Sequence, residues 1–434
     1  MNLFDKILDL IALPIRKLWR VAAHGTPQEQ FRVIFTFAVL MVGSSYLTTG
    51  GQIIIFGFDE PMYLAAGELV FQGEIDAYRT PVYPLICKIC LILSQDYGLW
   101  LVVAVQTIMF LVSVVAMHKA CCLLAKDSPL LRFIAEACYS CNSAVSLWIF
   151  HILTESLSIS IVVLLSYLII LVLKGVAQFR HGIYLSVLFL TMLFLKPYFI
   201  CFAPAVLIAI FLAYRKGTTS ARIAFAIGVI LNVGAYLTYC HQYEKKYGIF
   251  ATTCVGVQNL YGQIGRLGPR VDGVQINLNK KFVGHWIAEN EIPNAQQVCK
   301  KTIKEKPIEY VMAVLTELSL SGSETIPDYH SFKLPIRVWE WLILAFIIRH
   351  LWRWRKRKAN VHIHAVFAIM AICGIFTAVT GSEFFNYGRL AMPVYPILCL
   401  MIAAPGNFRE DKEEKDTETA DAPQYKECTE KDAH

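Results

Sequence analysis

The chain has 434 residues, of which 56% are hydrophobic, and its mean hydropathy is +0.50. Its apolar runs exclude an ordinary soluble protein, because several approach the roughly 20 residues that cross a bilayer. The formal charge of +7 is uneven: residues 409–434 hold ten acidic and five basic side chains, which leaves +12 on the rest. Such an excess is typical of a membrane protein with cationic cytosolic loops. The composition predicts an all-α polytopic membrane protein.

Residues 1–30 are predicted to form an interfacial amphipathic helix. Apolar side chains recur at helical spacing, with Lys and Arg off that stripe, and such a helix lies on an anionic membrane surface. The stripe consists of Phe4, Leu8, Ile11, Ile15 and Leu18. A helix packed on its own protein would show the same pattern, so this alternative stays open.

The apolar runs predict about ten transmembrane helices. They are expected at approximately 32–49, 99–117, 129–149, 156–173, 182–195, 199–213, 221–239, 336–348, 362–380 and 388–404. Residues 83–94 are also apolar, but a run of about twelve residues is too short to span a bilayer. We therefore expect a re-entrant or half-embedded helix there.

Basic connections between the spans define the expected topology. With 83–94 not crossing, they all fall on one side, as the positive-inside rule requires. They contain Arg16, Lys17, Arg20, Lys119, Lys126, Arg132, Lys174, Arg180, Arg215, Lys216, Arg222 and the run 349–358. We expect a membrane domain at 31–404, with external loops 50–98 and 240–335, and a disordered acidic cytosolic tail at 405–434. Both termini are then cytosolic, in what we expect to be a bacterial inner membrane.

The long loop 240–335 is expected to hold short external helices. Residues 295–318 are helix-like, with Pro307 starting a second helix at its first turn. The segment 252–275 is rich in Gly, shows no clear period and is predicted as loop. The thirteen cysteines show no metal-ligand spacing, but Cys254 and Cys299 could pair if this loop faces an oxidising compartment.

The adjacent acids Asp59 and Glu60 follow the first span directly. Two close carboxylates in a partly apolar site do not both ionise freely, so we expect one of them to have a pKa nearer neutrality and to act as general base. An exposed pair of loop acids is the alternative. The later acids of the same loop, Glu68, Glu74 and Asp76, are expected to face water.

Basic residues on the same predicted membrane face are candidates for binding an anion. They are Arg79, Lys88, Lys196 and Arg389. Lys196 interrupts an apolar run, where a cation needs a carboxylate or a phosphate as partner. Snorkelling of its amine to lipid headgroups is the alternative.

His151 and Glu155 lie at the start of a later span. Four residues apart, they would share one helix face and could bind an acceptor or orient the catalytic acid. The alternative is purely structural, with Thr154 capping the helix and Glu155 in its first turn.

The order and common sidedness of these motifs resemble the GT-C superfamily of membrane glycosyltransferases. The most similar branch holds the aminoarabinose transferase of lipid A and the protein O-mannosyltransferases. The shared motifs are an acidic pair, a Tyr-x-x-Ala helix leading to a Pro-rich turn, an acid at a later span mouth, a cation-Pro pair and an Arg-x-x-x-Pro. In this chain they are Asp59, Glu60, Tyr63, Ala66, Gly73, Pro81, Pro84, Glu155, Lys196, Pro197, Arg389 and Pro393. The resemblance covers most of residues 30–404.

The resemblance implies that Asp59 is the catalytic base, that the donor is a sugar on a polyprenyl phosphate, and that transfer inverts the anomeric centre. Where the aminoarabinose transferases carry Lys-Pro-Pro, this chain has Arg79, Thr80 and Pro81. Contact between Arg79 and the donor phosphate therefore stays open, with Lys88 and Lys196 as alternatives.

We thus expect a glycosyltransferase that acts on a glycan, lipid or protein acceptor at the external membrane face. The expected site residues are Asp59 and Glu60 for catalysis, Arg79, Lys88, Lys196 and Arg389 for the donor phosphate, and His151, Glu155, Tyr63 and Tyr83 for the acceptor. Membrane lipids are expected partners and nucleic acid is not. No cofactor or metal ligand is predicted, although a divalent cation is left open.

Two other functions stay open. A lipid-linked-sugar flippase or transporter would need polar residues within its spans, and the sequence offers few. These are Gln106, Glu136, Asn142 and Asn232. A polymerase or ligase that uses pyrophosphate-linked glycans would favour more paired arginines on the external face.

Overall fold

The computed structural model describes residues 3–55, 59–216, 219–265, 287–312, 361–380 and 387–404. Secondary structure in these ranges is helical, apart from an isolated bridge between Ile55 and His151. The predicted all-α class is therefore confirmed for the described residues. The predicted span 336–348, the basic run 349–358 and the tail 405–434 lie outside them.

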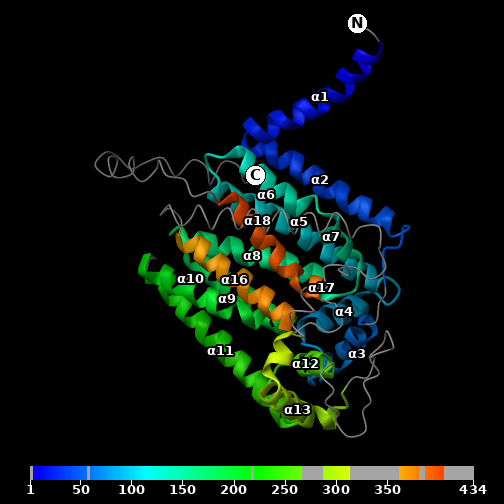
Figure 1. The fold of residues 1–434 in the computed structure, drawn as a ribbon, viewed down its shortest axis with the longest axis vertical. Helices are drawn as coiled ribbons and strands as arrows, with labels where there is room; N and C mark the ends of the chain where they lie inside the picture. Colours follow the sequence, from blue (N-terminus) through cyan, green and yellow to red (C-terminus); the bar gives the residue numbers. More distant parts are fainter. Residues whose placement is uncertain are drawn as a thin grey trace.

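Figure 1 shows how the helices are arranged. In chain order they are α1 (Leu3–His24), α2 (Pro27–Thr48), α3 (Glu60–Phe71), α4 (Val82–Leu93), α5 (Gly98–Leu124), α6 (Pro129–Ser140), α7 (Ser143–Leu147), η1 (Trp148–Phe150), α8 (Thr154–Leu173), α9 (Phe179–Leu195), η2 (Pro197–Phe202), α10 (Ala203–Lys216), α11 (Thr219–Tyr247), α12 (Val255–Gly265), η3 (Glu289–Glu291), α13 (Ile292–Glu305), α16 (Val361–Thr380), α17 (Tyr387–Ala391), η6 (Met392–Val394) and α18 (Tyr395–Ala403). A further helix begins at Pro307, as predicted, and is described as far as Met312.

Among the described helices, four are long and apolar enough to cross a membrane. They are α2, α5, α8 and residues Arg222–Tyr247 of α11. Shorter apolar helices accompany them at Val82–Leu93, Phe179–Leu195, Pro197–Leu212, His362–Ala378 and Arg389–Ala403. A protein embedded in a membrane is therefore supported. Ten complete spans are not, although the twelve-residue length predicted for the apolar helix at 83–94 is matched by α4.

The predicted span 129–149 is wrong as a single helix. It divides into α6 and α7, because the chain leaves helical geometry at Asn142, where the side-chain oxygen accepts from Ala144 N at 2.9 Å. An amide that caps a new helix start satisfies the backbone locally, so an apolar sequence can break there.

Helix α8 is the centre of the packing. Buried residues make up 83% of its membrane span, against 17% for α2 and 28% for the span in α11. Its serines are buried, and small side chains of this kind let neighbouring helices approach closely. These are Ser156, Ser158, Ser160 and Ser166. The N-terminus of α8 is therefore held firmly by the surrounding bundle.

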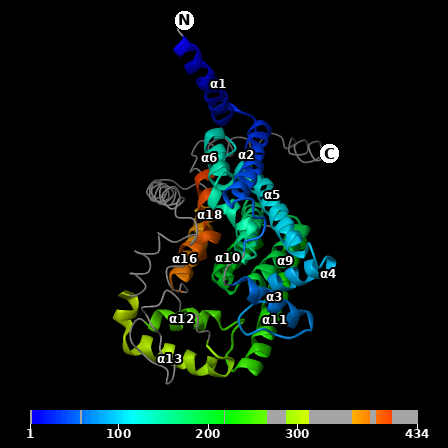
Figure 2. The same cartoon turned by 90° about the vertical axis from the view of Figure 1, so that its right-hand side faces the viewer.

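Helix α1 projects from the bundle at one end of the molecule in both views (Figures 1 and 2). Its apolar side chains Leu13, Ile15 and Trp19 are more than half exposed, at 51%, 63% and 61%. Such exposure is unfavourable in water and is what the membrane-surface interpretation requires. The N-terminal part of the predicted stripe has side chains outside the described set.

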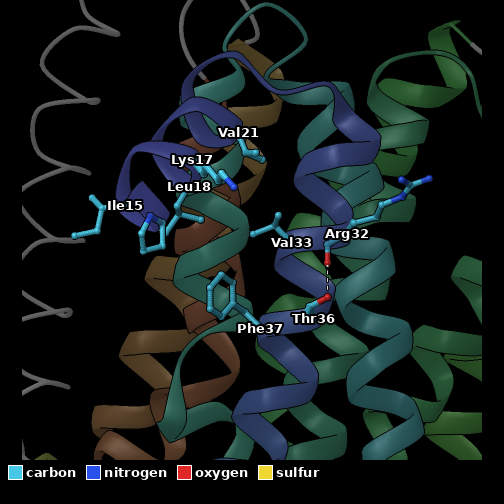
Figure 3. A pocket seen from close by; sticks show the side chains of 9 residues that line it. Ile15, Lys17, Leu18, Val21, Arg32, Val33, Thr36 and Phe37 are labelled. Carbon is cyan, nitrogen blue, oxygen red and sulfur yellow. Dashed lines mark hydrogen bonds between the residues drawn. The ribbon is translucent and has the colours of Figure 1, made fainter. Parts of the chain in front are cut away.

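A groove with a volume of about 540 Å³ separates α1 from α2. Apart from Lys17, Arg32 and Thr36, its lining side chains are apolar, and the Arg32 guanidinium extends away from them, as Figure 3 shows. The Thr36 hydroxyl donates to the Arg32 carbonyl at 2.8 Å.

At the other end of the molecule, α12 and α13 lie together with α3 (Figures 1 and 2). A second apolar cluster lies here, and it includes Ala77, Tyr243, Tyr261, Ile292 and Cys299. The prediction of loop for 252–275 is wrong at α12, because packing on α13 compensates the helical cost of its glycines. Cys254 and Cys299 are both free, buried thiols in this cluster.

Candidate functional site

A connected set of charged side chains, called the charge network below, joins segments far apart in the sequence. Its members are Asp59, Arg79, Glu155, Lys196 and Arg389. The Arg389 guanidinium is central: Nε donates to Glu155 Oε1 at 2.7 Å, and Nη2 donates to Asp59 Oδ2 at 2.8 Å. Arg79 Nη2 donates to Asp59 Oδ1 at 2.7 Å. Lys196 Nζ donates to Glu155 Oε1 at 3.1 Å.

Asp59 lies directly before α3, in the N-cap position. Its side chain makes no capping hydrogen bond to the helix and instead accepts from the two arginines. A carboxylate at a helix start usually satisfies the free backbone N–H groups. The Asp59 carboxylate instead pairs with Arg79 and Arg389, so these ion pairs, and not helix capping, set its orientation.

The turn before Arg79 is fixed on several sides. Asp76 Oδ1 accepts from Arg79 N at 2.7 Å and from Tyr78 N at 2.8 Å. The Tyr243 hydroxyl and Cys254 N, from α11 and the segment before α12, donate to the Ala77 carbonyl at 2.7 and 2.9 Å. The expectation that Asp76 only faces water is therefore wrong. Its spacing of three residues before Arg79 is the sequence signal that was missed, because Asp commonly closes such turns.

Glu155 and Lys196 hold the inner side of the charge network. Glu155 is in the first turn of α8 and fully buried, and Lys196 joins α9 to η2. Thr80 Oγ1 donates to the Leu195 carbonyl at 3.0 Å, which ties the Arg79 loop to the same corner. Lys196 thus has the carboxylate partner that a cation in an apolar run requires. The snorkelling alternative does not fit this contact.

Exposure differs across the charge network. Asp59 and Arg389 are each 22% exposed, Lys196 is 12% exposed and Glu155 is 0% exposed. Asp59 and Arg389 are therefore the members most accessible to a ligand. Glu155 is on the buried side, where it pairs with Arg389 and Lys196. Direct contact between Glu155 and an acceptor is not favoured by this burial.

Asp59 does not have the near-neutral pKa that was expected for one acid of the pair. Burial favours its neutral form, but the charges of Arg389 and Arg79 outweigh burial and hold the pKa of Asp59 below its ordinary value. Glu60 is fully buried in the first turn of α3. The expectation of an exposed pair of loop acids is therefore wrong for both residues.

The predicted acceptor residues lie behind the charge network. The Arg79 guanidinium lies 4.5 Å from the centre of the Tyr63 ring, a cation-π contact, and Tyr63 meets Tyr83 edge-on at 5.0 Å. The Tyr83 hydroxyl donates to Gln106 Oε1 at 3.3 Å, and Gln106 Nε2 donates to the His151 carbonyl at 2.9 Å. Gln106, which sequence reasoning associated with transport, therefore braces the site.

His151 is not on the same helix face as Glu155, because His151 has extended geometry and α8 begins only at Thr154. The predicted spacing of one helical turn does not apply to them. The structural alternative is confirmed for Glu155, which lies in the first turn of α8, but it is wrong for Thr154, because the N-cap residue is Leu153 and makes no side-chain capping bond.

Lys88 lies apart from the charge network. From α4 it pairs with Glu68 on α3, where the glutamate is 53% exposed. The structure therefore brings together Arg79, Lys196 and Arg389 among the four predicted phosphate-binding cations, but not Lys88.

The five described members of the charge network are three cations and two carboxylates. Three cations gathered at one end of an apolar bundle suit an anionic ligand such as a phosphate. Comparison with protein families, with characterised proteins and with solved structures gives no match for this chain.

Proposed function

We propose that the protein is an integral membrane glycosyltransferase that moves a sugar from a polyprenyl-phosphate donor to an acceptor hydroxyl. The observation that carries this proposal is the charge network, in which Asp59 contacts two of the cations directly. A proton acceptor and a phosphate clamp are the two functions that such a transfer needs. The resemblance of Asp59, Lys196 and Arg389 to GT-C motifs agrees with this assignment.

The proposed chemistry gives each group one role. Asp59 accepts the proton of the acceptor hydroxyl as the hydroxyl oxygen bonds to the anomeric carbon. The bond from that carbon to the phosphate oxygen breaks, and the phosphate leaves with the electron pair. Arg389, supported by Arg79 and Lys196, stabilises the negative charge that grows on the phosphate. Such fixed charges act strongly where water is excluded.

The low pKa of Asp59 fits a base that is activated by the donor. In the free protein, Arg389 and Arg79 stabilise the ionised carboxylate and weaken it as a base. When a donor phosphate shares these guanidinium groups, its negative charge offsets them and the proton affinity of Asp59 rises. Glu155 holds Arg389 in place throughout and is a positioning residue in this mechanism.

The transporter alternative relied on polar residues within the spans, and two of them, Asn142 and Asn232, contact the backbone. Asn232 Nδ2 donates to the Ser186 and Gly228 carbonyls at 3.1 and 2.7 Å, and Asn142 caps α7. These contacts tie the Asn232 amide nitrogen and the Asn142 amide oxygen to the backbone, and they give the transporter alternative no specific support. Sugar transfer from labelled polyprenyl-phosphate donors, in proteoliposomes that contain the purified protein, separates the two functions. Movement of the intact donor across the bilayer without transfer would favour the transporter.

The decrease of kcat/KM on the acid side of the pH profile should occur at low pH. Only the ionised Asp59 is a base, and its pKa is lowered. We therefore expect kcat/KM to stay level from about pH 8 to 5, and to decrease only at a pH below the ordinary aspartate pKa of about 3.9. Arg79→Gln removes one stabilising cation and should move this decrease to higher pH. Lys88→Gln, which changes a cation outside the charge network, should leave it in place. A decrease near neutral pH that Arg79→Gln does not move would contradict this role of Asp59.

We further propose that the charge network faces the non-cytosolic side. In a cysteine-depleted background, Lys300→Cys on exposed α13 should react with an impermeant maleimide on intact cells. Lys126→Cys, on the exposed connection between α5 and α6, should react only after permeabilisation. The opposite pattern would reverse the orientation.

A further inference from the structure

A second group of polar side chains lies on α5 and α6, away from the charge network. His118 and Cys122 are one helical turn apart on α5 and therefore share a face, and Glu136 meets them from α6. His118 lies twelve residues beyond Gln106, which is roughly 18 Å along the helix axis. The lysines Lys119 and Lys126 flank this end of α5, as they do where a helix reaches the headgroup level.

The three side chains are arranged as ligands of one ion. Their potential ligand atoms all lie within 4.8 Å of one another. His118 Nδ1 is 3.0 Å from both oxygens of Glu136, and Cys122 Sγ is 4.0 Å from Nδ1 and 3.5 Å from Nε2. Neighbouring ligand atoms around a tetrahedral zinc ion are roughly 3 to 4 Å apart. Binding would thus need only small movements.

The chemistry of the donors selects the ion. One imidazole, one thiolate and one carboxylate are a set that zinc accepts, whereas calcium and magnesium prefer oxygen ligands alone. The thiolate of Cys122 and the carboxylate of Glu136 together balance the charge of Zn²⁺. A neutral occupied site lowers the cost of placing an ion in an apolar bundle.

The surroundings allow entry of an ion and restrain its ligands. The His118 side chain is 14% exposed and Cys122 is half-buried, whereas the Glu136 side chain is 1% exposed. The Phe31 ring lies 4.8 Å from the imidazole and limits its rotation. Arg132, one turn before Glu136, donates to Gln30 Oε1 at 2.6 Å, so its guanidinium is held by α2.

We propose that His118, Cys122 and Glu136 bind a zinc ion that joins α5 to α6. With these three protein ligands, the fourth position is left to water or to an external ligand. The prediction that no cysteine has metal-ligand spacing overlooked the His-x-x-x-Cys spacing of His118 and Cys122. The third ligand comes from another helix and had no sequence signal of its own.

The test uses the full-length protein in detergent after dialysis against a chelator. Reconstitution with Zn²⁺ alone, followed by desalting, should leave about one ion per chain. Co²⁺ in place of Zn²⁺ should give a thiolate-to-metal charge-transfer absorption. Zinc should also protect Cys122 from alkylation in peptide mass spectra, while the half-buried Cys373 on α16 reacts as before.

Variants assign the ligands. Cys122→Ser and His118→Gln should lose the bound zinc and the rise in melting temperature that zinc produces, and Cys373→Ser should keep both. The protection measurement needs no variant, so it decides the question even if a substituted protein does not fold. The proposal is overturned if the parent retains no zinc, or if zinc leaves Cys122 as reactive as Cys373. The His118 contact with Glu136 would then be a structural ion pair only.

Discussion

Replacing Asp59 with Asn should lower sugar transfer roughly 10²- to 10⁴-fold, the usual effect of removing a general base. The amide keeps the shape of the side chain and its oxygen still accepts from Arg79 or Arg389, but it cannot take the acceptor proton. Donor binding should survive, because the cations of the charge network remain and one of their competing anions is gone. Transfer and donor binding are measured on the same proteoliposomes with labelled polyprenyl-phosphate sugars.

Two further variants make this result specific. Glu60→Gln should have a milder effect if Glu60 only positions groups around the base, and the reverse ranking would assign the base to Glu60. Glu68→Gln is the matched control, since this acid is on the same helix but pairs with Lys88 outside the charge network. Transfer at the parent rate in Asp59→Asn and Glu60→Gln would sink the proposed mechanism and favour the transporter.

The long spans could be predicted because their signal is local. Helices α2, α5, α8 and α11 each contain an apolar stretch that has no alternative in a bilayer, where backbone groups must bond within the segment. The break at Asn142 and the helix α12 could not be predicted in the same way. The first depends on one side-chain cap, and the second on packing against α13, and neither changes the apolar pattern.

The sequence predicted which residues gather at the site, but not which of them pair with one another. Sidedness placed Asp59, Arg79, Glu155 and Arg389 at one membrane end, and the structure joins them by ion pairs. The sequence could not show that Arg389 bridges two carboxylates. Glu155 lies 234 residues before Arg389 and Asp59 lies 330 residues before it, so no local pattern links them. Nor could the sequence exclude Lys88, whose direction depends on how α4 packs on α3.

Charge balance predicts a smaller loss of stability for Arg389→Ala than for Glu155→Ala. Arg389→Ala leaves two complete pairs, Arg79 with Asp59 and Lys196 with Glu155, so the fold keeps its buried charges compensated. It removes the two charged hydrogen bonds to Glu155 and Asp59 but leaves neither carboxylate without a cation. Glu155→Ala instead leaves Lys196 and Arg389 without this buried carboxylate, and loss of such a partner costs about 3 to 5 kcal/mol. Melting temperatures in detergent should therefore fall much further for Glu155→Ala.

Activity should be strongly reduced in the more stable of the two variants. Removing one charge that stabilises the leaving phosphate costs about 10²- to 10³-fold in rate, so Arg389→Ala should show a lower turnover, a higher KM for the donor, or both. Lys196→Ala should show the same kind of donor defect, while Lys88→Ala, the matched cation outside the charge network, should behave like the parent. If Arg389→Ala and Lys196→Ala instead keep the parent's donor dependence, these two cations serve the fold alone. If Arg389→Ala melts as early as Glu155→Ala, the guanidinium is a structural bridge first, because two remaining ion pairs were then not enough to hold the membrane end together.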